Sequence, residues 1–149
     1  MSDQPYIYSR AGTPPFDYPA DFVKAGNCGL VALSIASKRP LAEVTEWFRV
    51  KEKRRSNWGG ATHPTNYMAF LQYAGIWAQF TRYNTKERVR TVGDFCEWKA
   101  GNDRFFVVGV RSHVVLVKQG WICDQNELAP LTHHWCRNKR VMESWEILT

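Results

Sequence analysis

The stretch that decides the fold is KAGNCGLVALSIASKRP, Lys24–Pro40, in which a cysteine stands at the start of an almost wholly apolar run. Asn27 is a favoured N-cap residue, so the pattern predicts a helix from Cys28 to Lys38. Apolar side chains would cover most of its circumference: Leu30, Val31, Ala32, Leu33, Ile35 and Ala36. A helix that is apolar on nearly every side must be buried, so we place it at the centre of the fold.

After this central helix, the sequence predicts further helices and then mostly strands. A second helix opens at Pro40, a third runs from Pro64 to Gly75, and a short one begins at the capping pair Thr91 and Asp94. Strands are expected at Ile76–Thr81, Arg104–Arg111, His113–Lys118, Gly120–Gln125 and Ser144–Leu148, with a last helix near Leu131–Arg137. This order predicts an α+β fold, an N-terminal helical half packed on a C-terminal antiparallel sheet.

The bulk composition fits one domain. The chain has 149 residues, of which 44% are hydrophobic and 14% aromatic, enough to build a core. Residues 1–22, rich in Pro, Gly, Tyr and Asp, are expected to form an extended N-terminal arm on the single domain 1–149. Neither a secretory leader nor a membrane span is recognisable, so we expect a soluble, cytoplasmic protein with reduced thiols and no cofactor.

The charge of the chain favours acidic partners in general. Its formal net charge is +6 and its isoelectric point is near 9.3. A single-stranded nucleic acid would need aromatic and basic residues interleaved along a groove, and only Tyr73–Arg90 approaches that mixture. We interpret that segment as a strand with core-facing aromatics followed by a charged loop, and expect neither a nucleic-acid nor a membrane partner.

Cys28 and His113 are the first candidates for chemistry. A cysteine in the first turn of a helix meets unpaired N–H groups and the positive end of the helix dipole, which favour the thiolate. His113 opens the apolar run HVVLVK directly after the turn-like Ser112, a place where core packing does not call for an imidazole. An imidazole at such a sheet edge could face the start of the central helix and act as a base.

Asp124 is the third candidate. With a two-residue turn at Gln119–Gly120, residue 113 pairs near 126 and residue 115 near 124, so His113 and Asp124 lie on one face of the hairpin. A carboxylate there would orient the imidazole while the imidazole takes the thiol proton. The structural alternative is that Cys28 fills the core, His113 belongs to a turn and Asp124 bonds to backbone.

The order NCG, two further helices, a strand, a short helix and a His-led hairpin ending in Asp resembles the papain-like cysteine peptidase superfamily. In layout it is closest to the bacteriocin-processing peptidase domains. The resemblance covers the chain from Asn27 onward and rests on NCG and the S-H-V-V-L-V…D run. It implies a thiol hydrolase acting on an amide in a protein or peptide substrate, with Cys28 as nucleophile, His113 as base and Asp124 as orienter. It further implies that Trp58, Gly59 and Gly60 line the substrate cleft.

Two departures from that family bear on activity. Relatives carry a glutamine six residues before the nucleophile to complete the oxyanion hole, and here Phe22 stands at that position. The Asn27 amide could replace it, although it would then not cap the helix; losing one such donor costs about 3 kcal/mol in known enzymes. Asp124 is followed by Gln125 and Asn126 rather than proline, and Asn126 could orient His113 if the register shifts. The alternative function is therefore a weakly active or inactive module of the same fold that binds a protein partner.

The remaining histidines and cysteines are candidate ligands of a metal site. His133, His134 and Cys136, with Cys123 or Cys96 upstream, match no zinc-binding spacing, and adjacent histidines on one helix point in different directions. We therefore expect no metal. His63, beside Pro64, is interpreted as a helix-capping residue rather than a cleft residue.

Overall fold

The computed structural model describes residues 28–55, 58, 62–83, 91–98 and 104–148. Their helices are α1 (Cys28–Ser37), α2 (Leu41–Lys51), the 3-10 helix η2 (Pro64–Asn66), α3 (Tyr67–Tyr73) and α4 (Val92–Trp98). Their strands are β1 (Ala78–Arg82), β2 (Phe105–Val110), β3 (His113–Lys118), β4 (Trp121–Cys123), β5 (Leu128–Pro130) and β6 (Glu143–Ile147). The strands form one antiparallel sheet in the order β1-β6-β2-β3-β4-β5, which confirms the α+β class.

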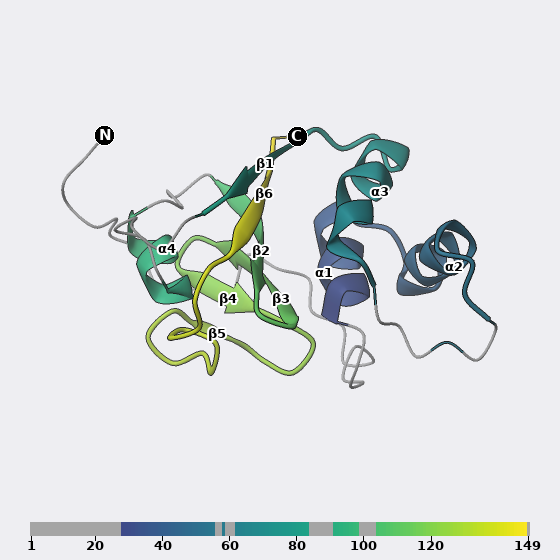
Figure 1. Cartoon of the computed structure of the whole chain (residues 1–149). Coiled ribbons are helices and arrows are strands. Elements are labelled where there is room, and N and C mark those ends of the chain that lie inside the picture. The colour runs from purple at the N-terminus through teal and green to yellow at the C-terminus, as the bar shows by residue number, and fades with distance from the viewer. Residues whose placement is uncertain (1–27, 56–57, 59–61, 84–90, 99–103, 149) are drawn as a thin grey trace.

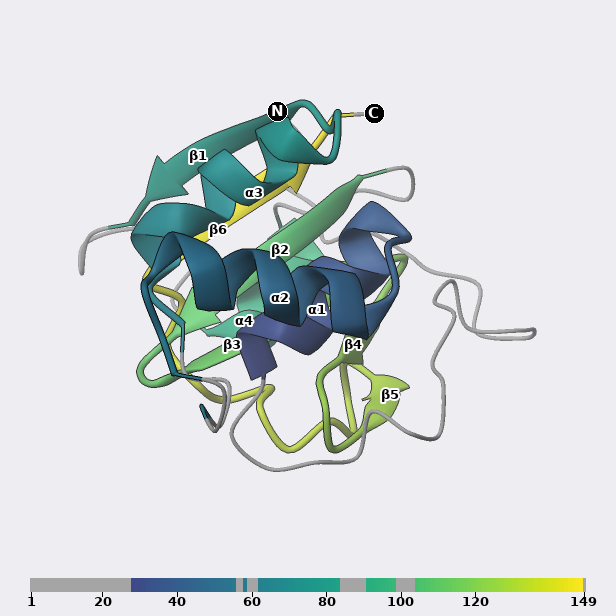
Figure 2. The same cartoon turned by 90° about the vertical axis from the view of Figure 1, so that its right-hand side faces the viewer.

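Helix α1 lies against the sheet, with α2 and α3 beside it on the same face (Figure 1, Figure 2). Eight of its ten residues are buried, as a helix that is apolar all round requires. Its core partners on the sheet are side chains of the same face of β2, β3 and β6, among them Val107, Leu116 and Trp145. The prediction of a central buried helix starting at Cys28 is confirmed. Because the length of α1 is packed on the sheet, its first residue, Cys28, lies close to the sheet as well.

The hairpin of β3 and β4 turns at Gln119 and Gly120, both of which have positive φ, 53° and 77°. Two consecutive residues in that region make the turn that suits two-residue hairpins. The register that follows pairs Leu116 with Cys123, as predicted. Because side chains alternate along a strand, this register brings His113 and Asp124 to the same face.

Helix α4 covers the opposite face of the sheet, so helices lie on both sides of it (Figure 1). The predicted capping pair is present: the Asp94 N–H donates to Thr91 Oγ1 at 3.0 Å, and the Thr91 N–H donates to the Asp94 carboxylate at 3.2 Å. Phe95 and Cys96 of α4 pack on Val108 and Val115 in a second core cluster. Only the helices α1 to α3 therefore form the predicted N-terminal helical layer.

The predicted last helix is wrong. Residues 131–139 form a series of turns, with the His134 N–H donating to the Pro130 carbonyl and the Arg137 N–H donating to the His134 carbonyl. The segment follows a strand that the sequence did not predict, because Leu128–Pro130 pairs with β4 as β5. Its side chains turn back onto the end of β4, where they take part in the site described below.

Trp77 and Phe80, just before and within β1, are largely exposed and not core-facing, contrary to our interpretation of Tyr73–Arg90. Trp77 is 74% exposed, while Phe80 is 42% exposed and packs partly on Trp145. The expected strand is present, and residues 84–90 lie outside the described part of the chain. No described helix is both long enough and apolar enough to cross a bilayer.

Candidate active site

Cys28 is the first residue of α1 and is only half-buried. Its position follows from the packing of α1: the apolar length of the helix is held against the sheet, and its N-terminal end reaches the edge where β2 turns into β3. There Cys28 and His113 line a pocket of about 360 Å³ between α1, α3 and the sheet. Cys28 therefore meets solvent in a concave site instead of filling the core.

The Cys28 thiol and the His113 ring line the same pocket and shift each other's pKa. Burial by itself would raise the pKa of Cys28, but the hydrogen bond to His113 and its charge outweigh burial and lower the pKa below its ordinary value. The backbone N–H groups of Val114 and Gly29 act in the same direction. The site therefore favours the thiolate, the form of cysteine that acts as a nucleophile.

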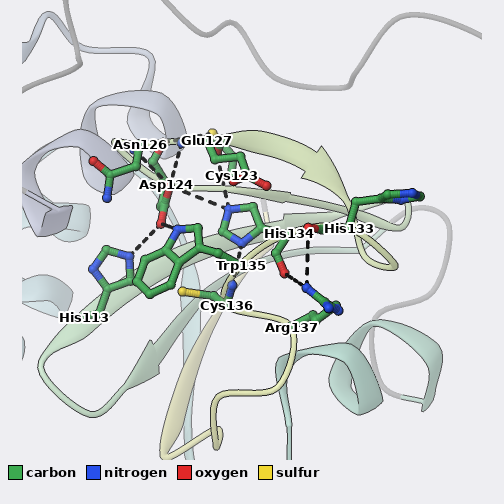
Figure 3. Close-up of polar contacts among 10 residues, drawn as sticks. All are labelled: His113, Cys123, Asp124, Asn126, Glu127, His133, His134, Trp135, Cys136 and Arg137. Carbon is green, nitrogen blue, oxygen red and sulfur yellow. Dashed lines mark hydrogen bonds and ion pairs between the residues drawn. The ribbon is translucent and has the colours of Figure 1, made fainter.

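His113 is held from its other side by Asp124. Its Nε2 donates to Asp124 Oδ2 at 2.8 Å, so the remaining nitrogen, Nδ1, points away from the carboxylate (Figure 3). Burial would lower the pKa of His113, but the hydrogen bonds to Asp124, Cys136 and Cys28 outweigh it and raise the pKa to about 11. The imidazole is thus kept protonated, as a partner of the Cys28 thiolate must be.

Asp124 is fixed by donors on both carboxylate oxygens. Oδ1 accepts the backbone N–H groups of Asn126 and Glu127 at 2.9 and 2.8 Å, and Oδ2 accepts the Trp135 indole N–H at 2.8 Å. Burial opposes ionisation, but these bonds and the two nearby histidines hold the pKa of Asp124 far below its ordinary range. Asn126, the alternative orienter, reaches Asp124 only through its backbone, so the described partner of His113 is Asp124.

The turn segment after β5 adds two groups to the site: His134, which the sequence analysis considered only as a metal ligand, and Trp135, which it did not consider. His134 is fully buried, with Nε2 3.6 Å from Asp124 Oδ1. Burial would lower its pKa, but the bond to Asp124 raises it to about 9. Trp135 lies beside His113 with ring centroids 5.1 Å apart (Figure 3). The segment thereby shields the His113–Asp124 hydrogen bond.

Cys136 is a second thiol near the same imidazole. The ligand atoms of His113, Asp124 and Cys136 lie within 4.8 Å of one another, a grouping of the kind that can hold a metal. Burial would raise the pKa of Cys136, but hydrogen bonds with His113 and His134 lower it. His133, His134, Cys96 and Cys123, which belonged to the sequence-based metal hypothesis with Cys136, are not in this group. Because both Asp124 oxygens already accept donors, we interpret the group as a hydrogen-bond network.

Accessibility separates the two thiols. Cys136 is 0% exposed and does not line the pocket, whereas Cys28 does. Cys96 and Cys123 are also buried, and burial followed by the charge of Asp124 raises the pKa of Cys123 to about 12. Of the four cysteines, Cys28 is the one that combines a lowered pKa with access to the pocket.

The pocket floor beside Cys28 is formed by Gly29, Thr62 and Tyr67. The hydroxyl groups of Thr62 and Tyr67 share a hydrogen bond of 3.0 Å directly over Gly29. A Cβ at position 29 would collide with the Tyr67 hydroxyl. Glycine is therefore required after the cysteine by packing, not by backbone conformation.

We expect Gly29→Ala to lower the free energy of unfolding by about 1–3 kcal/mol, the usual cost of overpacking a filled core. Urea unfolding measures it. The matched control is the same substitution in a Thr62→Ala, Tyr67→Phe background, which removes both hydroxyl groups that the new methyl group would meet. An equal cost in both backgrounds would contradict this explanation.

The other residues predicted for the site are the oxyanion donor, the cleft residues and a capping histidine. Asn27, Gly59 and Gly60 lie outside the described residues. Trp58 is half-buried, packs against the first core cluster and lies under the Arg54 guanidinium; its role in substrate binding stays a prediction. His63 precedes η2 but makes no side-chain cap, and its ring contacts Arg54 instead.

Sequence reasoning also missed pocket residues that come from distant elements. Tyr67 and Glu143 line the pocket, from α3 and β6, and so does Gln125, just after β4. Gln125 alone carried a signal, since it follows the candidate Asp124 in the chain. Comparison of the chain with models of known families, with curated proteins and with solved structures gives no match.

Proposed function

We propose that this protein is a papain-like cysteine hydrolase that cleaves amide bonds in a protein or peptide substrate. The observation that carries the proposal is the chain of contacts from Cys28 through His113 to Asp124, with Cys28 at a pocket. The three side chains come from α1, β3 and the end of β4, and only the fold brings them together. Their pKa shifts run in the directions that a thiolate and imidazolium pair requires.

The proposed reaction begins with attack of the Cys28 thiolate on the carbonyl carbon of the substrate. The carbon–nitrogen bond breaks as His113 donates its proton to the leaving amine, which leaves a thioester on Cys28. Water then attacks the thioester, with the neutral His113 accepting its proton, and the acid product departs as the thiolate re-forms. Asp124 keeps the imidazole oriented and stabilises its charged form throughout.

The developing oxyanion would be stabilised by the backbone N–H groups in the first turn of α1, which have no partner within the helix. The glutamine that supplies the second donor in the resembling family is replaced here by Phe22. This departure favours the second candidate function, a module of the same fold that binds a protein partner without turnover. The two candidates differ in whether Cys28 forms and releases an acyl group.

The test is a set of peptide and isopeptide amides incubated with wild type, Cys28→Ser and Cys123→Ser. We expect release of amine by the wild type and by Cys123→Ser, whose buried thiol lies off the pocket, and none by Cys28→Ser. Mass spectrometry would show the acyl adduct on Cys28. If no substrate is turned over and a partner isolated with the protein binds Cys28→Ser equally well, the binding module is the better account.

A further inference from the structure

One end of the sheet carries more than the two reacting groups. Neighbouring strands β6, β2, β3 and β4 all present an end there, since β2 pairs with both β6 and β3. Glu143 begins β6 and His113 begins β3, while Gln125 follows β4. At roughly 4.8 Å between strands, Glu143 lies about two strands from His113 on one side and Gln125 about one strand away on the other.

Glu143 reaches the pocket because Gly109 has no side chain. The two residues are paired across β6 and β2, and a Cβ on Gly109 would come within 2.9 Å of Glu143 Cγ and 3.2 Å of Oε1. The carboxylate therefore lies over Gly109, where it lines the pocket with Cys28 and Tyr67. In the described part of the chain it has neither a hydrogen bond nor an ion pair.

Glu143 also determines the net charge of the pocket. Among the described lining residues, the other ionisable groups are Cys28, His113 and Tyr67. Cys28 and His113 sum to zero whichever of them holds the shared proton, and burial keeps Tyr67 neutral by raising its pKa far above the ordinary value. The described lining therefore carries a charge of about −1, on a chain whose net charge is +6.

Gln125 offers a second acceptor in the same pocket. Its side chain lines the pocket, the residue is only 6% exposed, and its carbonyl oxygen Oε1 has no hydrogen-bond partner among the described residues. A buried carbonyl without a donor is costly unless a ligand supplies one. The pocket thus presents acceptors on both sides of His113, and a complementary substrate brings donors.

We propose that Glu143 is a specificity residue that selects substrates carrying a cationic group, such as a lysine or arginine side chain, on the β6 side of the bond attacked by Cys28. The inference rests on the proposed function, because it assigns the substrate class of the same site. The cation replaces the missing partner of the Glu143 carboxylate, and Gln125 accepts an N–H group of the substrate on the opposite side.

The test uses small thiol reagents of different charge on the full chain. Rates of Cys28 modification are measured by mass spectrometry with methanethiosulfonates that carry a trimethylammonium, a neutral methyl or a sulfonate group. We expect Glu143→Gln to lower the ratio of cationic to anionic rates by about fivefold or more, since a charge about two strand spacings, roughly 10 Å, from His113 is removed. Glu143→Asp keeps the charge and should retain most of the ratio.

The matched control is Glu146→Gln, the same change on the same strand, whose carboxylate pairs with Arg104 instead of facing the pocket. A second measurement compares N-acetyl-arginine methylamide with its neutral citrulline analogue as protectants of Cys28 against the neutral reagent. We expect the arginine compound to protect at a lower concentration in wild type, and the two to protect alike in Glu143→Gln.

An unchanged charge ratio in Glu143→Gln, or equal protection by both compounds in wild type, would overturn the specificity proposal. Its failure is distinct from failure of the proposed function. In the first case Cys28 still reacts quickly with the neutral reagent and depends on His113; in the second case that neutral rate is itself slow and independent of His113.

Discussion

Replacing His113 with alanine is expected to slow alkylation of Cys28 at about pH 7 by tenfold or more. Burial raises the pKa of Cys28 and is the largest single influence on it; His113 supplies the hydrogen bond and the charge that chiefly oppose burial, so removing the ring raises the pKa. Each unit of pKa above the working pH lowers the thiolate fraction about tenfold. The measurement is the rate of iodoacetamide adduct formation on Cys28, followed by mass spectrometry.

The dependence of the alkylation rate on pH shows in which direction the pKa of Cys28 moves. In wild type the midpoint of the rise in rate should lie below the ordinary cysteine pKa of 9.0, and in His113→Ala the rise should move to higher pH. The two rates should therefore approach each other in alkaline solution. His63→Ala is the matched control, because His63 is exposed and contacts Arg54 rather than the pocket. Equal rates for wild type and His113→Ala at neutral pH would show that Cys28 is not activated by the imidazole.

Asp124→Asn is expected to be the most damaging single change for stability, by about 3–5 kcal/mol at neutral pH. Every partner of the carboxylate is a donor: two backbone N–H groups on one oxygen, and His113 and Trp135 on the other. In asparagine an NH2 group takes the place of one carboxylate oxygen, and in either orientation of the amide this donor would face other donors. Loss of the buried charge would also leave the protonated rings of His113 and His134 without their anion.

The pH dependence separates the charge from the shape of this side chain. Since the folded-state pKa of Asp124 lies below its ordinary value of 3.8, its stabilising contribution is present above that pH and is lost as the pH falls. Urea unfolding of wild type and Asp124→Asn should therefore give values that converge in acid. Asp94→Asn, in the capping pair of α4, should cost only about 1 kcal/mol. A constant difference between wild type and Asp124→Asn at all pH values would contradict the assignment.

The sequence was most informative where local rules and burial agree. The burial of helix α1 follows from its all-round apolar character. The register of β3 and β4 follows from Gln119–Gly120, because a two-residue turn allows only one pairing of the two strands. That register alone brought His113 and Asp124 to one face. Contact between this pair and Cys28 then depended on where α1 packs on the sheet, which the all-round apolar character of the helix does not specify.

The segment 131–139 could not be predicted because long-range contacts decide it. Leu131, His134 and Trp135 have spacing compatible with a helix, but His134 and Trp135 turn to Asp124, and the Arg137 carbonyl accepts the N–H of Gly93 at the start of α4. These bonds replace those of a helix. Glu143 was missed for a related reason: nothing local to it signals that Gly109, thirty-four positions earlier, leaves room for its side chain.

The central claim is that Cys28 exists as a thiolate paired with the His113 imidazolium. The most direct measurement is the ultraviolet absorbance of the thiolate, titrated with acid in wild type and in Cys28→Ser, so that the difference belongs to Cys28. The account predicts thiolate absorbance already present at about pH 7, which disappears with a midpoint below 9.0. A midpoint at or above 9.0, the value of an unassisted thiol, would contradict it.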